Sequence, residues 1–143
     1  MIQQFISDIC DILNIATPSV SFDISNFPTN TMMAQVNSSG DTIYLKKYDK
    51  PNPDQLFSIA HELRHIWQIQ NNNHLYFSTY KPINLCKSVE EYNLQIAELD
   101  ANAFGGLIMI DFFNLKPLFE GVPNSVKVKI YEQMEYLRTE FFR

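Results

Sequence analysis

Residues 60–68 read AHELRHIWQ, and the interpretation of the whole chain starts from this stretch. His61 and His65 are four positions apart, so on a helix they lie one turn apart on the same face. Both imidazoles can then reach one ion, and neutral imidazole is a good ligand for zinc. Glu62 lies at the edge of the same face, where its carboxylate can hold and deprotonate a water molecule.

This HExxH motif also has a purely structural interpretation. In that case His61 and His65 are core or capped histidines, and Glu62 lies on a solvated helix face. A bare HExxH arises by chance in roughly a few chains per thousand of this size, so the motif needs support from its surroundings. A clear helix start and a β-hairpin precede it, and a second helix with acidic residues follows. These features favour the metal-binding interpretation.

The helix that carries the motif has a strong start signal. Asn52 can cap it, Pro53 suits the first helical position, and Asp54 favours the positive end of the helix. The helix is expected to run to about Gln70, where the three asparagines at 71–73 break it. Its apolar positions recur at helical spacing: Leu56, Ile59, Ala60, Leu63, Ile66 and Trp67.

A second helix is expected to supply the third metal ligand. Residues 74–87 are predicted to be a loop, after which Ser88 and Glu91 form a capping-box pattern that opens a long helix to about Met109. Glu90 and Glu91 belong to the first turn, where acids are expected for capping alone. The ligand is therefore sought further along this helix.

Glu98 is the preferred third ligand. It lies beside small residues that let another helix approach closely, namely Ala97, Ala101 and Gly105. Asp100 is two residues further on, about 200° round the helix, and cannot share the direction of Glu98. The alternative for Glu98 is an ordinary surface acid. Cys86 is a weaker candidate, because an isolated cysteine before a helix is more often a small buried residue.

The remaining segments predict a small sheet and two more helices. The expected elements are a helix over 2–15 ended by Thr17-Pro18, a strand over 20–24, a hairpin of 32–36 and 42–45, and a last helix over 125–141. The predicted fold class is α+β, with an antiparallel or mixed sheet, and residues 1–143 are expected to form a single domain.

Composition excludes several classes of protein. The chain has 143 residues, of which 45% are hydrophobic, enough for a real core. Its 11 basic and 16 acidic residues give a net charge of −5, which disfavours nucleic acid and anionic membranes as partners. Cys10 and Cys86 are too few for a disulfide framework, so free thiols are expected. The N-terminus lacks a signal peptide pattern, and a cytoplasmic location is expected.

Two segments of the chain resemble a known group of enzymes. The sequences AHELRHIWQ at 60–68 and AELDANAFGGLIM at 97–109 resemble gluzincin-type zinc metallopeptidases, most closely the ImmA/IrrE-like and minigluzincin-like groups. In these groups HExxH is followed by a helix that reads roughly E-x-x-A-N/D-x-F-A. Glu98, Ala101, Asn102 and Phe104 match that pattern, while Gly105 replaces the usual alanine.

The resemblance implies a zincin-like domain with one zinc ion per chain. It implies that His61, His65 and Glu98 bind the metal and that Glu62 is the catalytic base. It also implies that Asn102 supports a ligand, because related gluzincins often have an aspartate there that orients a zinc-bound histidine. An asparagine can still accept an N–H through its carbonyl, with less charge.

The resemblance further implies a role for the hairpin strand at 42–46. In zincins the strand before the active helix is commonly a sheet edge that pairs with extended substrate, so Ile43, Tyr44 and Leu45 are candidates for that edge. The alternative is an ordinary edge strand protected by Lys46 and Lys47.

Peptide hydrolysis also requires a hydrogen-bond donor for the oxyanion. His74, Tyr76 and Tyr80 lie in the predicted loop and are candidates, and Tyr131 and Arg138 are others. Aromatic residues at such places are more often packing residues. The remaining aromatic residues are interpreted as packing residues, including Trp67, Phe112, Phe113, Phe141 and Phe142.

Three functions follow from these patterns. The first is a zinc endopeptidase that acts on a narrow range of protein or peptide substrates. The second is a zinc-binding, zincin-fold regulatory module with little or no catalysis, against which the intact Glu62 argues. The third is a metal-free helical interaction protein. The basic and aromatic C-terminus at 138–143 could cover the cleft, or could simply be a helix end, where cations are favoured.

Overall fold

The computed structural model describes residues 1–141. Phe142 and Arg143 lie outside the described residues, as does the side chain of Phe141, and the packing expected for Phe141 and Phe142 lies outside them too. Within the described part, helices combine with a three-stranded mixed sheet, and the expected α+β class is confirmed. The elements in order are α1 (Ile2–Leu13), β1 (Ser19–Ser21), β2 (Ala34–Val36), β3 (Thr42–Leu45), α2 (Pro53–Phe77), the 3₁₀ turn η1 (Ile83–Leu85), α3 (Val89–Asn93), α4 (Ile96–Phe113) and α5 (Asn124–Phe141).

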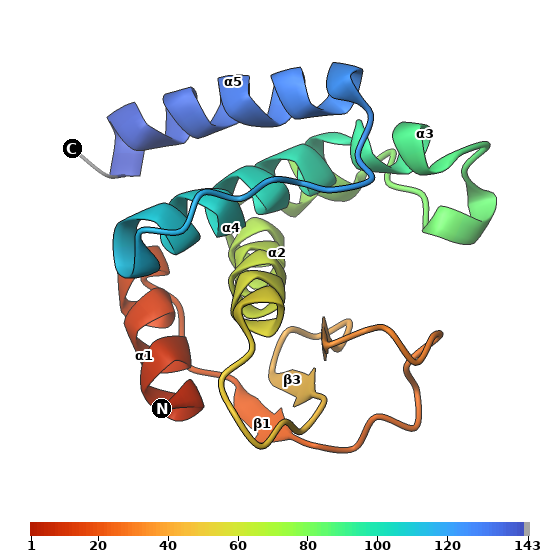
Figure 1. Ribbon diagram of the computed structural model, residues 1–143. Coiled ribbons are helices and arrows are strands. Elements are labelled where there is room, and N and C mark those ends of the chain that lie inside the picture. Colours follow the sequence, from red (N-terminus) through yellow and green to blue (C-terminus); the bar gives the residue numbers. More distant parts are fainter. Residues whose placement is uncertain (142–143) are drawn as a thin grey trace.

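The helices stack over the small sheet. Helices α2 and α4 share the largest interface, and α5 packs along α4 on the side away from the sheet (Figure 1). The sheet lies beneath α2, with strand β2 against that helix, and α1 flanks α2 on the other side. This arrangement places α2 between α4, the sheet and α1, in contact with all three.

Strand β3 is the central strand of the sheet. The strand order is β1-β3-β2, with β1 parallel to β3 and β2 antiparallel to it. The predicted hairpin of β2 and β3 is confirmed, but the prediction that Ile43, Tyr44 and Leu45 form a substrate-binding edge is wrong. The hairpin is visible in the sequence because its turn is local, whereas β1 reaches β3 only through a crossover.

Strand β1 is also shorter than expected. It ends at Ser21, and the predicted strand over 20–24 is correct only at its start. The chain turns here because the Ser21 hydroxyl accepts from the backbone N–H of Asp23, whose carboxylate accepts in turn from the N–H of Ser25. Such local side-chain bonds compete with the ladder of a strand.

Helix α2 starts where the sequence predicts and continues further. The Asn52 side chain accepts from the N–H of Asp54 at 3.0 Å, and Pro53 is the first helical residue. The predicted break appears as a kink, with Asn72 alone in a non-helical conformation. The Asn72 side chain accepts from the N–H of Leu75 and so caps a further turn that ends at Phe77. Residues 74–77 are therefore helical, against the expectation of a loop.

The predicted long helix over 88–109 is divided in two. Ser88 and Glu91 form the expected cap of α3, but the helix stops after Asn93 and α4 begins at Ile96. Between them Gln95 is extended, and its amide both accepts from and donates to the backbone of Lys81. The break places Glu98 in the first turn of α4, at the positive end of that helix.

The two predicted outer helices are confirmed, and each buries one face. Helix α5 buries a stripe facing α4, consisting of Val126, Ile130, Met134 and Leu137. Helix α1 buries Phe5, Ile6, Ile9 and Leu13, and it ends at a left-handed Asn14, three residues before the predicted Thr17. No helix within residues 1–141 combines the length and apolar character that crossing a membrane requires.

The cysteines and several aromatic residues behave as the sequence indicates. Both Cys10 and Cys86 are free thiols, and burial raises the pKa of Cys10 to about 11. The rings of Phe112 and Phe113 pack against Phe5, with ring centroids 6.0 and 5.7 Å from it.

Candidate metal centre

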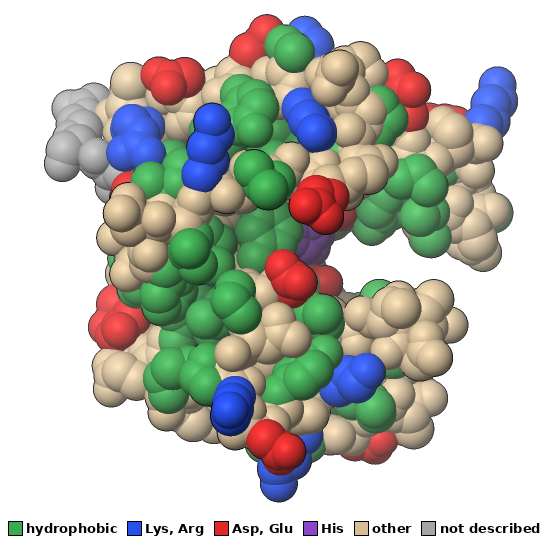
Figure 2. All heavy atoms as spheres, viewed as in Figure 1, with side chains coloured by type: hydrophobic (Ala, Val, Ile, Leu, Met, Phe, Trp, Pro, Cys, Tyr) green, Lys and Arg blue, Asp and Glu red, His purple; other side chains and the backbone are tan. Residues whose placement is uncertain are grey.

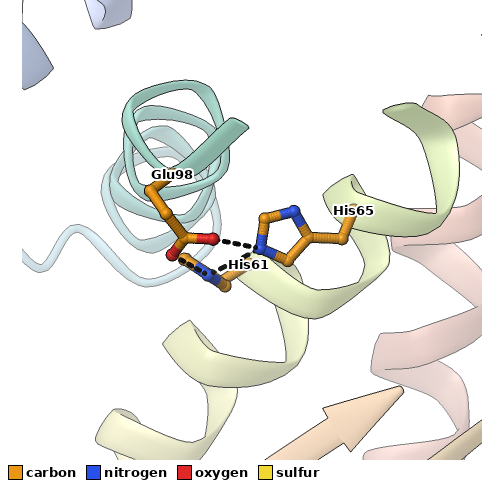
Figure 3. A group of neighbouring side chains, drawn as sticks. All are labelled: His61, His65 and Glu98. Carbon is orange, nitrogen blue, oxygen red and sulfur yellow. Dashed lines mark hydrogen bonds and ion pairs between the residues drawn. The ribbon is translucent and has the colours of Figure 1, made fainter. Parts of the chain in front are cut away.

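Three side chains from two helices point at one place. His61 and His65 lie on consecutive turns of α2, and Glu98 projects from α4 toward both rings (Figure 3). The two Nε2 atoms are 3.1 Å apart. The Glu98 carboxylate lies 3.3 Å from Nε2 of His61 and 3.0 Å from Nε2 of His65. The structure therefore brings together the three residues that the sequence proposes as ligands.

The close approach of α2 and α4 makes this convergence possible. A Cβ atom at Gly105 would lie 3.0 Å from the ring of Phe57, which precedes His61 by one helical turn. Ala97 and Ala101, in the same strip of α4, are fully buried. The predicted packing of a small-residue strip against the HExxH helix is confirmed at Gly105.

The donor spacing fits a tetrahedral ion. Zinc bonds of about 2.0–2.1 Å at tetrahedral angles require donor atoms roughly 3.3 Å apart. The two Nε2 atoms are 3.1 Å apart, and each lies 3.0–3.3 Å from a different oxygen of Glu98. Two imidazole nitrogens and one carboxylate are the donor set of catalytic zinc sites with three protein ligands. Within residues 1–141, these three residues form the one group of side chains that could hold a metal ion.

Both histidines are held by amide oxygens on the ring edge opposite Glu98. Nδ1 of His61 lies 2.8 Å from Oδ1 of Asn102, one turn after Glu98, and Nδ1 of His65 lies 2.8 Å from Oε1 of Gln68. An amide oxygen can only accept, so in each pair the Nδ1–H donates. When the ring is neutral, its lone pair is therefore on Nε2. The position expected for Asn102 is thus observed.

Gln68 was missed by the sequence interpretation. It follows His65 by three positions on the same face of α2, and this spacing is the signal that could have found it. It is completely buried, and its amide nitrogen donates to the carbonyl of Ala97 at 3.0 Å and to Asp100 at 2.7 Å.

Asp100 points away from the cluster, as its position on the helix predicts. It forms a buried ion pair with Arg64, with Nε of Arg64 2.7 Å from Oδ2 of Asp100. The Arg64 guanidinium lies over the ring of Trp67 at 3.7 Å, so Trp67 is a packing residue. Cys86, the other alternative ligand, lies beside Gln95 instead.

Charge interactions shift the pKa values of the cluster. Burial acts to raise the pKa of Glu98, but the two imidazoles more than offset it and hold that pKa well below its usual value. Burial acts to lower the pKa of His65, but the hydrogen bond and charge of Glu98 raise it to about 9. The pKa of Glu62 is raised by burial, which the histidines only partly oppose. Glu62 therefore lies within the field of the cluster and holds a proton more readily than an exposed carboxyl.

Of the candidate oxyanion donors, Tyr80 reaches the cluster. Its hydroxyl donates to Oε2 of Glu98 at 3.1 Å and lies 2.9 Å from the hydroxyl of Tyr92. Burial and the charge of Glu98 raise the pKa of Tyr80 far above its usual value. Tyr92 was missed by the sequence interpretation, because nothing in its spacing marks it.

The other candidates lie elsewhere. His74 is exposed near the end of α2, and Tyr76 packs its ring against Trp67. Tyr131 packs against Phe119. Arg138 forms an ion pair with Asp111, at the end of α4 opposite Glu98. The described part of the segment at 138–143 therefore lies away from the cluster, against a role as a cover.

One side of the cluster is open to solvent. Figure 2 shows a hollow between the helices above and the sheet end of the chain below, with part of a histidine side chain visible at its inner end. Glu98 and His65 are almost completely buried, while His61 and Glu62 are partly exposed. Solvent therefore reaches the side of the cluster on which His61 and Glu62 lie.

Comparison of this chain with protein-family models, with curated proteins and with solved structures finds no significant match.

Proposed function

We propose that this chain is a zinc-dependent endopeptidase with a zincin-like fold. The observation that carries the proposal is the cluster of His61, His65 and Glu98. In each histidine Nδ1 is hydrogen-bonded to an amide oxygen, and Nε2 faces the Glu98 carboxylate. The order of helix, hairpin, HExxH helix and glutamate-bearing helix supports the zincin-like interpretation.

The residues divide the chemistry between them. A zinc ion, when bound by His61, His65 and Glu98, supplies Lewis-acid polarisation of the scissile carbonyl and a lowered pKa for water. Glu62 takes a proton from the attacking water and delivers it to the leaving amine, a role that suits a carboxyl whose pKa burial raises. Tyr80 donates to Glu98 and so holds this carboxylate in place.

An extended substrate would add to an outer strand of the sheet. Because β3 is paired on both sides, only β1 and β2 are available, and β2 is the one that packs against α2. Main-chain hydrogen bonds along β2 would align a peptide beside the helix that carries His61.

The test combines zinc stoichiometry with hydrolysis. Wild type should hold one zinc per chain, and Glu98→Ala should lose most of it because it removes the anionic ligand. Glu62→Gln should keep zinc and fold but cleave a quenched fluorescent peptide library about 10²–10⁴-fold more slowly, since glutamine cannot accept the proton. Elemental analysis, circular dichroism and mass spectrometry of the products measure these quantities.

Each outcome bears on a different part of the proposal. Full zinc in Glu98→Ala would place the third ligand elsewhere. Equal cleavage by Glu62→Gln and wild type would exclude the mechanism. Zinc-loaded wild type that cleaves nothing in the library would favour the regulatory module, and wild type without zinc would favour a metal-free interaction protein.

A further inference from the structure

Asp100 accepts hydrogen bonds from three side chains on two other elements. Arg64 donates to both of its oxygens, at 2.7 and 3.1 Å. Gln68 donates to Oδ2 at 2.7 Å, and Gln133 of α5 donates to Oδ1 at 3.0 Å. A carboxylate has about four acceptor positions, so these four bonds fill it. All four of these bonds are donated to Asp100, and the Arg64 guanidinium lies against it, so Asp100 serves only as an acceptor.

This arrangement determines which way the Gln68 amide faces. Its nitrogen is directed at two groups that can only accept, the carboxylate of Asp100 and the carbonyl of Ala97. Rotation of the amide by 180° would aim its oxygen at both acceptors and leave buried polar groups without a hydrogen-bond partner, which is strongly unfavourable. The Gln68 oxygen must therefore face His65.

The orientation of the Gln68 amide determines which nitrogen of His65 carries the proton. Because the Gln68 oxygen can only accept, Nδ1 of His65 must carry the proton. A neutral imidazole with its proton on Nδ1 has its lone pair on Nε2, the atom that faces His61 and Glu98. The orientation of each group follows from that of its neighbour, starting with the buried Arg64 guanidinium that pairs with Asp100.

We propose that Gln68 is a positioning residue for the metal centre, held by the Arg64–Asp100 pair so that His65 keeps its lone pair on Nε2. The inference rests on the proposed metal site and extends it. It assigns a role to four residues that bind no metal themselves, namely Gln68, Arg64, Asp100 and Gln133. Through Gln133 it also makes α5 a support of the centre. An imidazole without such a partner is free to carry its proton on Nε2, where it blocks the metal.

A purely structural role for Gln68 makes a different prediction. In that case its substitution lowers the stability of the fold, and zinc binding by the folded chain does not change. Gln55 provides the matched control, because it is also a buried glutamine of α2 and donates to two backbone carbonyls, those of Met33 and Lys46. It lies about two helical turns before His61 and contacts the sheet, away from the cluster.

The experiment compares Gln68→Met, Gln68→Glu and Gln55→Met with wild type. Zinc affinity is measured by competition with a chelator and corrected for the folded fraction, which urea unfolding gives. Proton NMR of the zinc-loaded protein counts slowly exchanging imidazole N–H signals, of which wild type should show two. Gln68→Met should lower zinc affinity about 10–100-fold and lose one signal. Gln55→Met should keep both signals and zinc affinity within about threefold of wild type.

Gln68→Glu separates positioning from packing. Its carboxylate still accepts from Nδ1–H of His65, so zinc affinity should stay within about threefold of wild type or rise, although the fold becomes less stable beside Asp100. Should this variant fail to fold, Gln68→Glu combined with Asp100→Asn takes its place, since the new amide at position 100 donates to the new carboxylate at position 68.

The outcomes distinguish this inference from the proposed function. Wild type that binds no zinc ends both. With wild type binding zinc, unchanged affinity in Gln68→Met overturns the positioning role and leaves the metal site intact. Equal losses in Gln68→Met and in the glutamate variant would also overturn it, because they would show that packing alone matters.

Discussion

The two histidines of the centre are supported in different ways. His65 is bonded to Gln68, which is fully buried and tied to α4 and, through Asp100, to α5. His61 is bonded to Asn102, which is half-buried, and lies on the open side of the cluster. The Nδ1–H bond of His65 is therefore held by a network that joins three helices, whereas that of His61 depends on one amide. Removal of the amide acceptor should disturb the fold and the metal together on the His65 side, and the metal alone on the His61 side.

The largest expected effect lies in the buried ion pair. Asp100→Ala leaves the Arg64 guanidinium, which is 1% exposed, without its counter-charge and should destabilise the zinc-free protein by about 3–5 kcal/mol. Asp111→Ala is the control, because it removes an exposed ion pair with Arg138 from the same helix and should cost about 0–1 kcal/mol. Urea unfolding measures both. Equal losses would show that the network on the His65 side does not support the fold.

If Asp100→Ala does not fold, a double variant tests whether the unpaired buried charge causes the loss of stability. Arg64→Met combined with Asp100→Leu replaces both charges with apolar groups of similar size, and such exchanges are often neutral or stabilising. It should therefore be more stable than Asp100→Ala. If it is less stable, the charge itself is not the cause of the loss.

The next effect concerns the open side. Asn102→Ala should lower zinc affinity about 10–100-fold, because His61 loses the acceptor that orients its ring. Stability should change by less than about 1 kcal/mol, since Asn102 is half-buried and, within residues 1–141, its side chain bonds His61 alone. Asn102→Asp should retain or increase affinity, because a carboxylate accepts the same N–H with more charge. Zinc titration and urea unfolding test this, and a large loss of stability in Asn102→Ala would remove the contrast between the two histidines.

The smallest expected effect concerns the packing of α2 on α4 beside His61. Gly105→Ala places a Cβ atom 3.0 Å from the ring of Phe57, whose centroid is 6.3 Å from that of His61. Overpacking of about 1–3 kcal/mol should outweigh the gain in helix propensity of about 1 kcal/mol and should weaken zinc binding slightly.

Gly106→Ala is the control for this substitution. Its Cβ atom would meet the flexible end of Met134 at 3.3 Å and Pro117 at 3.2 Å, on the side of α4 that faces α5. Met134 can move, so stability should stay near that of wild type and zinc affinity should not change. Thermal unfolding and zinc titration of both variants measure the difference. Zinc affinity that falls equally in both would show that the His61 side does not depend on the Phe57 contact.

The parts of the site that the sequence predicts are local to a helix. The four-residue spacing of His61 and His65 and the angle between Glu98 and Asp100 follow from helix geometry alone. The caps at Asn52 and Ser88 are local for the same reason, and the structure has both. The sequence pattern is sufficient for these because the interacting groups lie within a few residues of each other.

Other features depended on contacts between distant segments. Strand β3 became central because β1 joins it across the crossover, and this pairing leaves no mark on the residues of β3 itself. The helix over 88–109 was divided because Gln95 bonds the backbone of Lys81, fourteen residues earlier. The extra turn of α2 after Asn72 also escaped prediction, since a run of three asparagines predicts an end more strongly than a kink.

By itself, the sequence determined the class of the fold, the helix that carries the histidine pair and the three side chains that converge. It could do so because helix periodicity and capping are properties of neighbouring residues. Only the tertiary structure decided that Gln68 faces His65, that Arg64 and Asp100 form a buried pair and that α5 supports them. Arg64 and Gln133 lie 36 and 33 positions from Asp100, and the Gln68 amide is turned toward His65 by its bonds to Ala97 and Asp100, 29 and 32 positions away. A buried polar group takes its role from the donor or acceptor that the packing places beside it.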